Sequence, residues 1–347
     1  DSMKANITIK QIAQESNVSM ATVSRYLNGT VSVSEKKRRQ IEAVIQKYNF
    51  SPNTHARSLI SGRTMTLGIV VPDISNPYFY SLFLEIQKEA APKGYSLLLY
   101  NTSFQKGGPS CTEEEYFQRL IQHRVDGALV LGGQIDLISP SDSYIRALRN
   151  LGEYLPVVVM GSPVPNCSCR FIDMETGEGV SLLFHYLYSM GHREIAFIGG
   201  NTGVRITETR IQTYRNLLED YGLPLNPDYV VLTDYYAEDG YQAATNLLEK
   251  TRTFTAVIAA NDNVAMGALR AFADRGYKVP EDFSMVSCDR FSGGNYSIPR
   301  MTGVERDPAQ AGKLLTDCLF QDIENKPGEK PARLIPRFEE KASCRAL

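Results

Sequence analysis

The sequence contains no apolar run that approaches the roughly 18 residues needed by a membrane-spanning helix. Its first residues also lack the basic and then apolar pattern of a secretory signal peptide. With 43% hydrophobic and 22% charged residues, the composition is typical of a globular protein in water. We therefore expect a protein that stays in the cytoplasm and has no membrane partner.

Features of enzymes and metalloproteins are also scarce. No glycine-rich phosphate-binding loop opens a helix after the first expected strand, and no nucleophile elbow occurs. The four histidines form no metal-binding pattern, and Cys167 and Cys169 are the only close pair among six scattered cysteines. We interpret that pair as incidental thiols in a loop, and we expect no cofactor, no metal site and no catalytic activity.

Charge is distributed unequally along the chain, although the net charge is only −2. Residues 1–63 hold ten of the 37 Lys/Arg and four of the 39 Asp/Glu, a balance of +6 that leaves −8 for the remainder. A length of 347 residues also predicts two or three folding units. A small basic unit joined to an acidic body is typical of a polyanion-binding module attached to a part that does not touch the polyanion.

The segment from Thr8 to Asn28 predicts two short helices joined by a tight turn. Thr8 and Ser19 are suited to cap the two helices, and Asn17 tolerates the left-handed conformation of a turn. Apolar residues share one face in each helix: Ile9, Ile12 and Ala13 in the first, Val23 and Leu27 in the second. The pattern predicts a helix-turn-helix whose second helix enters a DNA major groove.

A third helix is expected from Ser34, because apolar residues recur at helical spacing through Ile41 and Val44 to Ile45 and Tyr48. Four basic residues at 36–39 crowd its first turns, where positive charge opposes the helix dipole. That cost favours contact with DNA phosphates, and a merely solvated face stays as the alternative.

Residues 51–63 are too few and too polar to hold a helix alone, since isolated helices below about 12 residues are marginal. A plain linker does not need Leu59 and Ile60, so both are candidate minor-groove wedges in a segment that folds on DNA. We expect a helix-turn-helix domain at 3–50, a hinge at 51–63 and a body at 64–347.

Buried strands and amphipathic helices alternate through the body. Expected strands lie at 67–71, 97–100, 128–131, 157–160, 195–198, 230–232, 256–259 and 285–287, and expected helices at 78–93, 113–123, 175–190, 208–221, 240–250 and 264–275. Such alternation implies parallel sheets covered on both faces, and two sets imply two lobes that face each other across a ligand-binding cleft. The fold class is therefore α/β with a small all-α head.

The amino-terminal pattern resembles the lac repressor (LacI/GalR) family of bacterial transcription regulators. The motif I-A-x-x-x-x-V-S-x-x-T-V-S-R-x-L-N occurs at residues 12–28, and the hinge motif N-x-x-A-R-x-L at residues 53–59. The resemblance implies that Met20, Ala21 and Arg25 read bases, with apolar contact from the first two and bidentate hydrogen bonds to guanine from Arg25. It implies that Leu59 inserts at the central base step. The expected DNA-binding residues are Thr8, Ser19, Met20, Ala21, Thr22, Ser24, Arg25, Asn28, Asn53, Ala56, Arg57 and Leu59.

The body resembles the two-lobed, periplasmic-binding-protein-like core of the same family. Its signposts are the segments at 67–79, 191–199 and 260–267. The resemblance implies three crossings between the lobes, with a first lobe of about 64–170 plus 302–325 and a second lobe of about 171–301 plus the carboxy-terminal segment. It carries the family's effector contacts to Tyr78, Phe79, Arg210, Tyr235, Asn261 and Asp289.

The chemistry of these effector residues suits a sugar. Arg210, Asn261 and Asp289 can bind vicinal hydroxyls, and aromatic rings can stack on a pyranose. The aromatic residues can equally be core, and the Asn261 and Asp262 pair can merely cap the next helix, a role we expect for Asp262. Arg290, beside Asp289, favours an acidic or phosphorylated ligand.

The resemblance implies a bacterial, nucleoid-associated homodimer that binds a palindromic operator and represses sugar-utilisation genes in response to an effector. A transport-type sugar-binding protein is an alternative for the body alone, and a sugar phosphate or a nucleobase is an alternative effector. The sequence does not distinguish inducer from corepressor, or repressor from activator, since both occur on one architecture.

Overall fold

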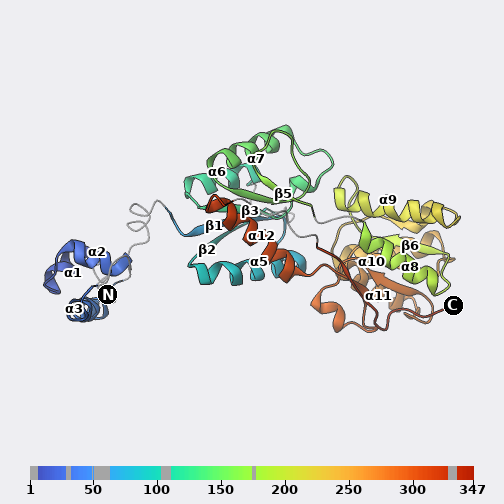
Figure 1. The fold of residues 1–347 in the computed structure, drawn as a ribbon. Helices are drawn as coiled ribbons and strands as arrows, with labels where there is room; N and C mark the ends of the chain where they lie inside the picture. Colours follow the sequence, from blue (N-terminus) through green and yellow to red (C-terminus); the bar gives the residue numbers. More distant parts are fainter. Residues whose placement is uncertain are drawn as a thin grey trace. The chain divides into compact units, whose positions relative to one another are not determined.

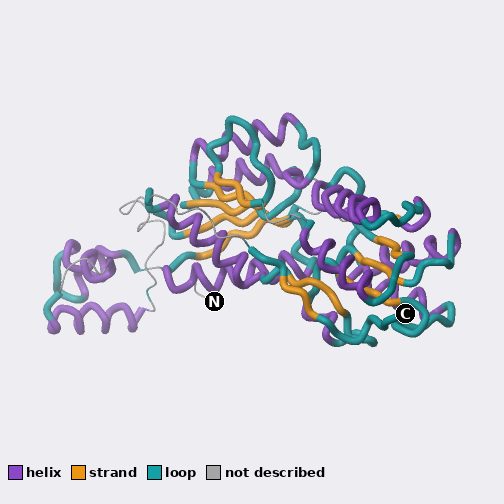
Figure 2. The backbone as a smooth tube through the Cα atoms, turned by 45° about the vertical axis from the view of Figure 1, so that its right-hand side comes forward, coloured by secondary structure: helices purple, strands orange, loops and turns teal. Residues whose placement is uncertain are grey.

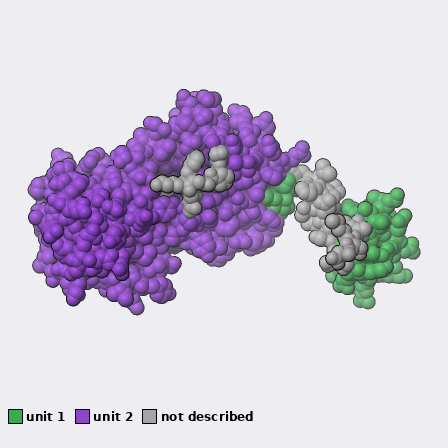
Figure 3. Space-filling view, turned by 180° about the vertical axis from the view of Figure 1, so that it is seen from behind, with its two compact units in different colours: residues 1–66 green, residues 67–347 purple. Residues whose placement is uncertain are grey.

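The computed structural model describes residues 7–28, 33–48, 50, 63–102, 111–173, 177–326 and 334–347. The chain divides into two compact units, residues 1–66 and 67–347 (Figure 3). No helix within the described ranges is long and apolar enough to cross a membrane.

The described part of the first unit contains three helices: α1 (Ile9–Glu15), α2 (Met20–Asn28) and α3 (Glu35–Tyr48). Ile12, Val23 and Ile41, one from each helix, are fully buried and form the centre of a small apolar core. The expected three helices are confirmed. A core of this size depends on good capping and on each of its few large side chains.

A five-stranded sheet organises the first lobe of the second unit (Figure 1). Its strand order is β2-β1-β3-β4-β5. Strand β3 pairs in parallel with β1 and β4, and β4 pairs in parallel with β5. The elements are β1 (Thr66–Val71), α5 (Pro77–Ala90), η1 (Ala91–Lys93), β2 (Ser96–Asn101), α6 (Glu113–Gln122), β3 (Gly127–Val130), η2 (Gln134–Asp136), α7 (Asp142–Tyr154), β4 (Val157–Met160) and β5 (Arg170–Ile172).

A six-stranded sheet of order β11-β10-β9-β8-β6-β7 organises the second lobe. All its pairs are parallel except the antiparallel pair β10 and β11. The elements are α8 (Glu178–Ser189), β6 (Ile195–Ile198), α9 (Arg205–Asp220), η3 (Pro227–Tyr229), β7 (Val230–Val231), α10 (Ala237–Lys250), β8 (Ala256–Ala259), α11 (Asp262–Asp274), β9 (Ser284–Ser287), η4 (Ser292–Asn295), β10 (Thr302–Glu305), α12 (Pro308–Ile323) and β11 (Arg337–Glu339).

Helices cover the sheets, as Figure 2 shows by placing the strands of each lobe between helices. In the second lobe, one apolar cluster joins the sheet to α10 and α11, and another joins it to α8 and α9. Helices α10 and α11 pack very closely, because a Cβ atom on Gly240 would lie 2.1 Å from the Val264 carbonyl oxygen and one on Gly267 1.8 Å from that of Ala237. Glycine at both positions lets the two backbones touch.

The two α/β lobes are confirmed, and each expected strand is present within one or two residues. The sequence analysis did not identify α7, α12, β5, β10 or β11. It was also wrong to assign residues from Thr302 to the first lobe, since β10 pairs with β9 in the second sheet. The chain returns to the first lobe only at α12, which packs on α5, β3 and β4.

Candidate DNA-binding and effector sites

The helix-turn-helix is built by short-range hydrogen bonds. The Thr8 hydroxyl accepts a hydrogen bond from the Gln11 amide at 3.3 Å, while Gln11 Oε1 accepts one from the Thr8 amide at 2.8 Å, a complete capping box. Asn17 has φ 52° in the turn, and Ser19 Oγ accepts from the Thr22 amide at 3.2 Å at the start of α2. The predicted caps and turn are confirmed.

The outer face of α2 carries the expected base-reading residues. Met20, Ala21 and Arg25 are exposed, and Met20 is 54% exposed. Val23, on the opposite face, is fully buried, which fixes the rotation of the helix. Ser19 also hydrogen bonds to the Thr22 hydroxyl at 2.8 Å, so these two hydroxyls hold the helix start.

Two carboxylates of α3 form ion pairs within the helix, and one of them also contacts α2. Glu42 accepts from Tyr26 Oη at 2.9 Å and from Arg38 Nε at 2.8 Å. Arg39 Nε pairs with Glu35 at 3.2 Å. Within the described part of the head, Lys36 and Lys37 have no ion-pair partner, so their ammonium groups are available to an anion.

The remaining predicted DNA contacts divide into two groups. Ser24 is partly exposed on α2. The hinge residues Asn53, Ala56, Arg57 and Leu59 lie outside the described residues, and so does the side chain of Asn28.

In the body, Arg210 of α9 and Asp289 after β9 form a buried ion pair. Arg210 Nη2 donates to both carboxylate oxygens at 3.0 and 2.9 Å, and Arg210 Nη1 donates to the Ala260 carbonyl at 2.9 Å. The two residues are only 3% and 8% exposed. These charge-assisted hydrogen bonds fix the guanidinium between the carboxylate and the backbone.

A second guanidinium reaches the same carboxylate. Arg306 Nε lies 2.7 Å from Asp289 Oδ1, and the Arg306 guanidinium stacks over the ring of Tyr78 at 4.7 Å. Burial opposes ionisation of Asp289, but the two arginines outweigh it and hold its pKa below the ordinary value. The carboxylate therefore stays ionised between two cations.

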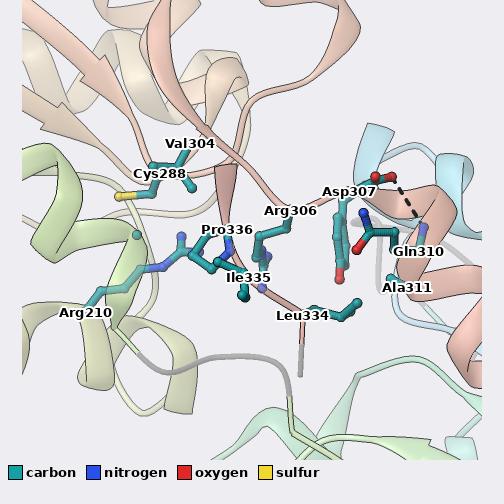
Figure 4. A pocket seen from close by; sticks show the side chains of 12 residues that line it. Arg210, Cys288, Val304, Arg306, Asp307, Gln310, Ala311, Leu334, Ile335 and Pro336 are labelled. Atoms are coloured by element: carbon teal, nitrogen blue, oxygen red, sulfur yellow. Dashed lines mark hydrogen bonds between the residues drawn. The ribbon is translucent and has the colours of Figure 1, made fainter. Parts of the chain in front are cut away.

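A cavity adjoins this group and draws residues from both lobes (Figure 4). Arg210, Cys288 and Val304 come from the second lobe, while Tyr78 and Gln310 come from the first. Figure 4 shows Arg210 and Arg306 extending toward the same space, which residues 334–336 also line. The cavity can therefore present two guanidinium groups and a phenol ring to one small molecule.

Tyr235 and Asn261 are engaged in local structure beside this group. Asn261 Oδ1 accepts from the Val264 amide at 2.9 Å, so Asn261 caps α11 and the expectation that Asp262 does so was wrong. Asn261 Nδ2 donates to the Tyr235 carbonyl at 3.0 Å, and Tyr235 Oη hydrogen bonds to Thr207 Oγ1 at 2.6 Å. The amide faces two backbone groups, which fixes its orientation.

Two aromatic residues lie in the first turn of α5, in the first lobe. Tyr78 and Phe79 contact edge to face at 5.4 Å between ring centroids, and Asn76 caps the helix by accepting from the Tyr78 amide at 3.0 Å. Phe79 lies beside Gly132, where a Cβ atom would be 3.4 Å from the ring. The strand-to-helix turn after β1 thus positions both rings.

Arg290 does not reach the cavity, so the expectation that it favours an acidic ligand was wrong. Its guanidinium contacts Glu339 of β11 and donates to Asn295 Oδ1 at 2.6 Å. The chain bends at Cys288 and Asp289 after β9, and the two adjacent residues have different partners: Asp289 pairs with Arg210 and Arg306, and Arg290 with Glu339 and Asn295.

The sequence analysis did not predict the hydrogen bonds that join the two lobes. Leu137 and Val204 form an isolated antiparallel bridge, and the Ile138 amide donates to the Gly203 carbonyl at 2.9 Å. Elsewhere, Tyr236 Oη of the second lobe donates to Asp73 of the first. These contacts join the loop after β3 to the loop after β6, and the loop after β1 to the segment after β7.

Comparison with known proteins agrees with this arrangement. Residues 8–53 match the model for bacterial regulatory proteins of the lacI family, and residues 184–344 match that for a periplasmic binding protein-like domain. The HTH-type transcriptional repressor PurR of Pasteurella multocida is 31% identical over 323 residues, covering 93% of this chain and 94% of the relative. The chain belongs to the LacI family.

A second relative supports membership of the LacI family, and a solved structure shows the same fold. The ribose operon repressor of Haemophilus influenzae is 30% identical over 328 residues, covering 94% of this chain and 95% of the relative. The lac repressor dimer bound to operator and the anti-inducer ONPF has the same fold, with TM-score 0.85 and 22% identity over 98% of this chain and 100% of that chain. The protein is thus a LacI-family DNA-binding transcriptional repressor, and its relatives are repressors rather than enzymes.

Arg306 is the main residue of this candidate effector region that the sequence analysis missed. It follows β10 at the crossing to the first lobe, and its contacts, Asp289 and Tyr78, are distant in the sequence. A basic residue in the segment that crosses between the lobes was the sequence feature that could have identified Arg306. Asp136 is a second such residue, and burial raises its pKa to about 6, with Arg306 and Arg205 opposing that rise.

Proposed function

We propose that this repressor binds a palindromic operator as a homodimer and that a sugar bound between the two lobes of the body controls its affinity for DNA. The observation that carries the proposal is the buried pair of Arg210 and Asp289, joined by the partly exposed Arg306, beside a cavity lined from both lobes. A ligand held there contacts both lobes at once, and can therefore favour one lobe arrangement over another.

For DNA, the proposal assigns base contacts to the exposed side chains of α2 and phosphate contacts to Lys36 and Lys37 of α3. Arg25 would donate two hydrogen bonds to guanine, and Met20 would contact a thymine methyl group. Leu59, outside the described residues, would act as the minor-groove wedge. One short recognition helix gives little specificity, so two copies related by a two-fold axis would read an inverted repeat.

For the effector, vicinal hydroxyls match the donors and acceptors present. Arg210 and Arg306 donate and the Asp289 carboxylate accepts, so a diol can replace part of the guanidinium contacts. The Tyr78 ring offers a face for the apolar side of a sugar ring. The name of the ribose operon repressor of Haemophilus influenzae supports a sugar, and that of PurR keeps a nucleobase as the competing ligand.

A specific observation favours an acidic sugar within that class. Two guanidinium groups share the single carboxylate of Asp289, and Arg306 is held over Tyr78 at the wall of the cavity. A carboxylate or phosphate group on the ligand can take the second guanidinium without breaking the Arg210 pair.

The test begins with an operator selected from random double-stranded DNA, followed by sedimentation of the protein on that DNA. We expect two chains per inverted repeat; a monomer on DNA contradicts the dimer. A thermal-shift screen then compares neutral sugars, sugar acids, sugar phosphates and purine bases, because a ligand at about 100 times its Kd stabilises by about 2.7 kcal/mol.

The ligand from the screen is titrated calorimetrically into wild type and Arg210→Ala. We expect Arg210→Ala to lose at least about tenfold in affinity, since a charge-assisted hydrogen bond is removed. Arg215→Ala, exposed on the same helix, is the matched control and should bind as wild type does. Unchanged affinity in a folded Arg210→Ala protein contradicts the assigned site, and a purine hit contradicts the sugar.

A further inference from the structure

A side-chain hydrogen bond joins the two lobes close in sequence to the expected effector residues. Tyr236 Oη, from the residue that precedes α10 in the second lobe, donates to the carboxylate of Asp73, which follows β1 in the first lobe. Asp73 is 6% exposed, whereas Tyr236 is 39% exposed. Burial and the hydrogen bond to Asp73 raise the pKa of Tyr236, so the phenol stays protonated and able to donate.

The Asp73 end of this hydrogen bond belongs to the turn that starts α5. The Asp73 carboxylate also accepts from the Ser75 amide at 2.9 Å and from the Ser75 hydroxyl at 2.8 Å, and the Asp73 carbonyl accepts from the Asn76 amide at 3.2 Å. Asn76 caps the helix that carries Tyr78. The position of Asp73 therefore sets the start of α5, and with it the Tyr78 ring that stacks against Arg306.

The Tyr236 end belongs to the turn that carries Tyr235. Tyr235 Oη is hydrogen bonded to Thr207 of α9, and the Tyr235 carbonyl accepts from Asn261 Nδ2 at 3.0 Å. The Tyr236 amide donates to Asp239 Oδ2 at 3.2 Å in the first turn of α10. These contacts attach the turn to the part of the second lobe that holds the expected effector residues.

We propose that Asp73 and Tyr236 are positioning residues for the effector site, and that their hydrogen bond holds the two lobes at the spacing at which both lobes line one cavity. The described residues that line the cavity do not include either of them, so the pair acts through the lobe arrangement and not by touching a ligand. When the lobes exchange between two arrangements, the apparent affinity for a ligand falls with the fraction of molecules in the competent one. The consequence for an effector rests on the proposed function, whereas the link between the lobes does not.

A second contact between the lobes supplies a reporter in loops that contain neither member of the pair. The Ile138 amide, after β3, donates to the Gly203 carbonyl, after β6, at 2.9 Å. Ile138 is 49% exposed, so its amide can exchange with water once the lobes separate. The rate of hydrogen exchange at Ile138 therefore measures the separation of the lobes without any ligand.

Tyr241 of α10 supplies a matched control. Its Oη donates to Asp274 Oδ2 of α11 at 3.2 Å, so this hydrogen bond lies within the second lobe. Both Tyr241 and Tyr236 donate from a phenol to an aspartate carboxylate, but only the hydrogen bond of Tyr236 joins the two lobes. Tyr241→Phe therefore removes the same oxygen atom and the same kind of hydrogen bond without removing a contact between the lobes.

The experiment measures hydrogen exchange of the full chain by mass spectrometry, without DNA or small molecules, using overlapping peptides that resolve the Ile138 amide. We expect Tyr236→Phe to speed exchange at Ile138 by about tenfold, because a hydrogen bond to a carboxylate that opposes separation of the lobes is lost. Tyr241→Phe should leave the rate as it is in wild type. Circular dichroism checks that each variant is folded.

A double-mutant cycle tests whether the pair acts as one link. Asp73→Ala should also speed exchange at Ile138, and adding Tyr236→Phe should change the rate little further, because both changes remove the same hydrogen bond.

Four outcomes overturn the proposal: an unprotected Ile138 amide in wild type, an unchanged rate at Ile138 in Tyr236→Phe, an equal effect of Tyr241→Phe, or full additivity in the double variant. An unchanged Ile138 with faster exchange confined to residues 72–80 and 233–240 would show that Tyr236 has a local structural role only. A ligand screen that finds no sugar would contradict the proposed function and leave these exchange rates as they are.

Discussion

Carboxylates in the head and in the body of this repressor occupy opposite environments. In the head, Glu15 accepts hydrogen bonds from Tyr48 at 2.6 Å and Lys47 at 2.9 Å, and Glu42 is bonded to Arg38 and Tyr26. These hydrogen bonds lower the pKa of both exposed groups. In the body, burial raises the pKa of Glu113 to about 7 and that of Asp262 to about 6.

This difference predicts how each unit responds to the substitution of a charged residue. Exposed ion pairs contribute little to stability, so the head can exchange its surface contacts for DNA phosphates at small cost. Buried charges are costly unless every partner stays in place, so the polar groups of the body are tied to its fold. Substitutions should therefore affect mainly DNA binding in the head, and folding as well as ligand binding in the body.

The largest expected effect comes from Asp289→Ala. The change leaves Arg210 and Arg306 without their shared carboxylate in a buried setting, and we expect the free energy of unfolding to fall by about 3 to 5 kcal/mol. Urea denaturation measures it. Asp317→Ala removes an exposed partner of Lys313 on α12 and should change stability far less. Equal losses in the two variants would contradict the contrast between buried and exposed charge.

Glu113→Gln tests the buried carboxylates through pH. The folded pKa of about 7 lies above the ordinary 4.5, so between these values the folded protein holds a proton that the unfolded chain has released. Stability due to this group is therefore present below pH 4.5 and is lost as pH rises to 7. The Glu113→Gln variant has no ionisable group at this position, so it does not lose stability over this pH range. Its side-chain oxygen can still accept the hydrogen bond that the Gln134 amide donates to Glu113 at 2.8 Å.

Above the folded pKa, we expect Glu113→Gln to be more stable than wild type by up to about 3 kcal/mol, from about 1.4 kcal/mol per pKa unit. The variants should converge in acid. Unfolding free energies measured across the pH range give the result, and parallel curves for wild type and variant would show that Glu113 ionises normally.

Local features of the fold were predictable from the sequence. Thr8, Asn17 and Ser19 act on residues at most four positions away, so their capping and turn roles can be read from the neighbouring sequence. Strands β4, β6 and β8 coincide with the expected ranges because each is a continuous apolar run buried in a parallel sheet. Helix α7 was missed although Tyr144, Leu148 and Leu151 follow helical spacing.

Features that depend on distant pairing were not predictable. Strands β5, β10 and β11 have three or four residues with little apolar pattern, and their neighbours in the sheet define them. The predicted pair Arg210 and Asp289 is brought together, but Arg306 joins it only because the chain crosses between lobes after β10. Arg290 shows the converse, since it is adjacent to Asp289 in sequence but contacts Glu339 and Asn295 instead of the cavity.

In the head, Arg25→Ala should reduce affinity for the selected operator by about 1 to 3 kcal/mol and relax the preference for one base in each half-site. The side chain is exposed on α2, so the variant should unfold at the same urea concentration as wild type. Binding to a set of operators with single-base changes measures the effect. A variant that keeps the full base preference would place α2 outside the major groove.

The smallest effect is expected from Lys37→Ala, which removes one phosphate contact and no base contact. Lys37 is exposed near the start of α3 and has no ion-pair partner in the described head, so neither folding nor base preference should change. Affinity should fall alike for every operator variant, and the slope of log affinity against log salt should decrease by about one unit, because one fewer counterion is released. Fluorescence anisotropy over a salt series gives that slope. Lys88→Ala, on α5 of the body, removes the same charge outside the head and should leave the slope unchanged. A change of base preference in Lys37→Ala would mean that α3, and not only α2, reads the sequence of the operator.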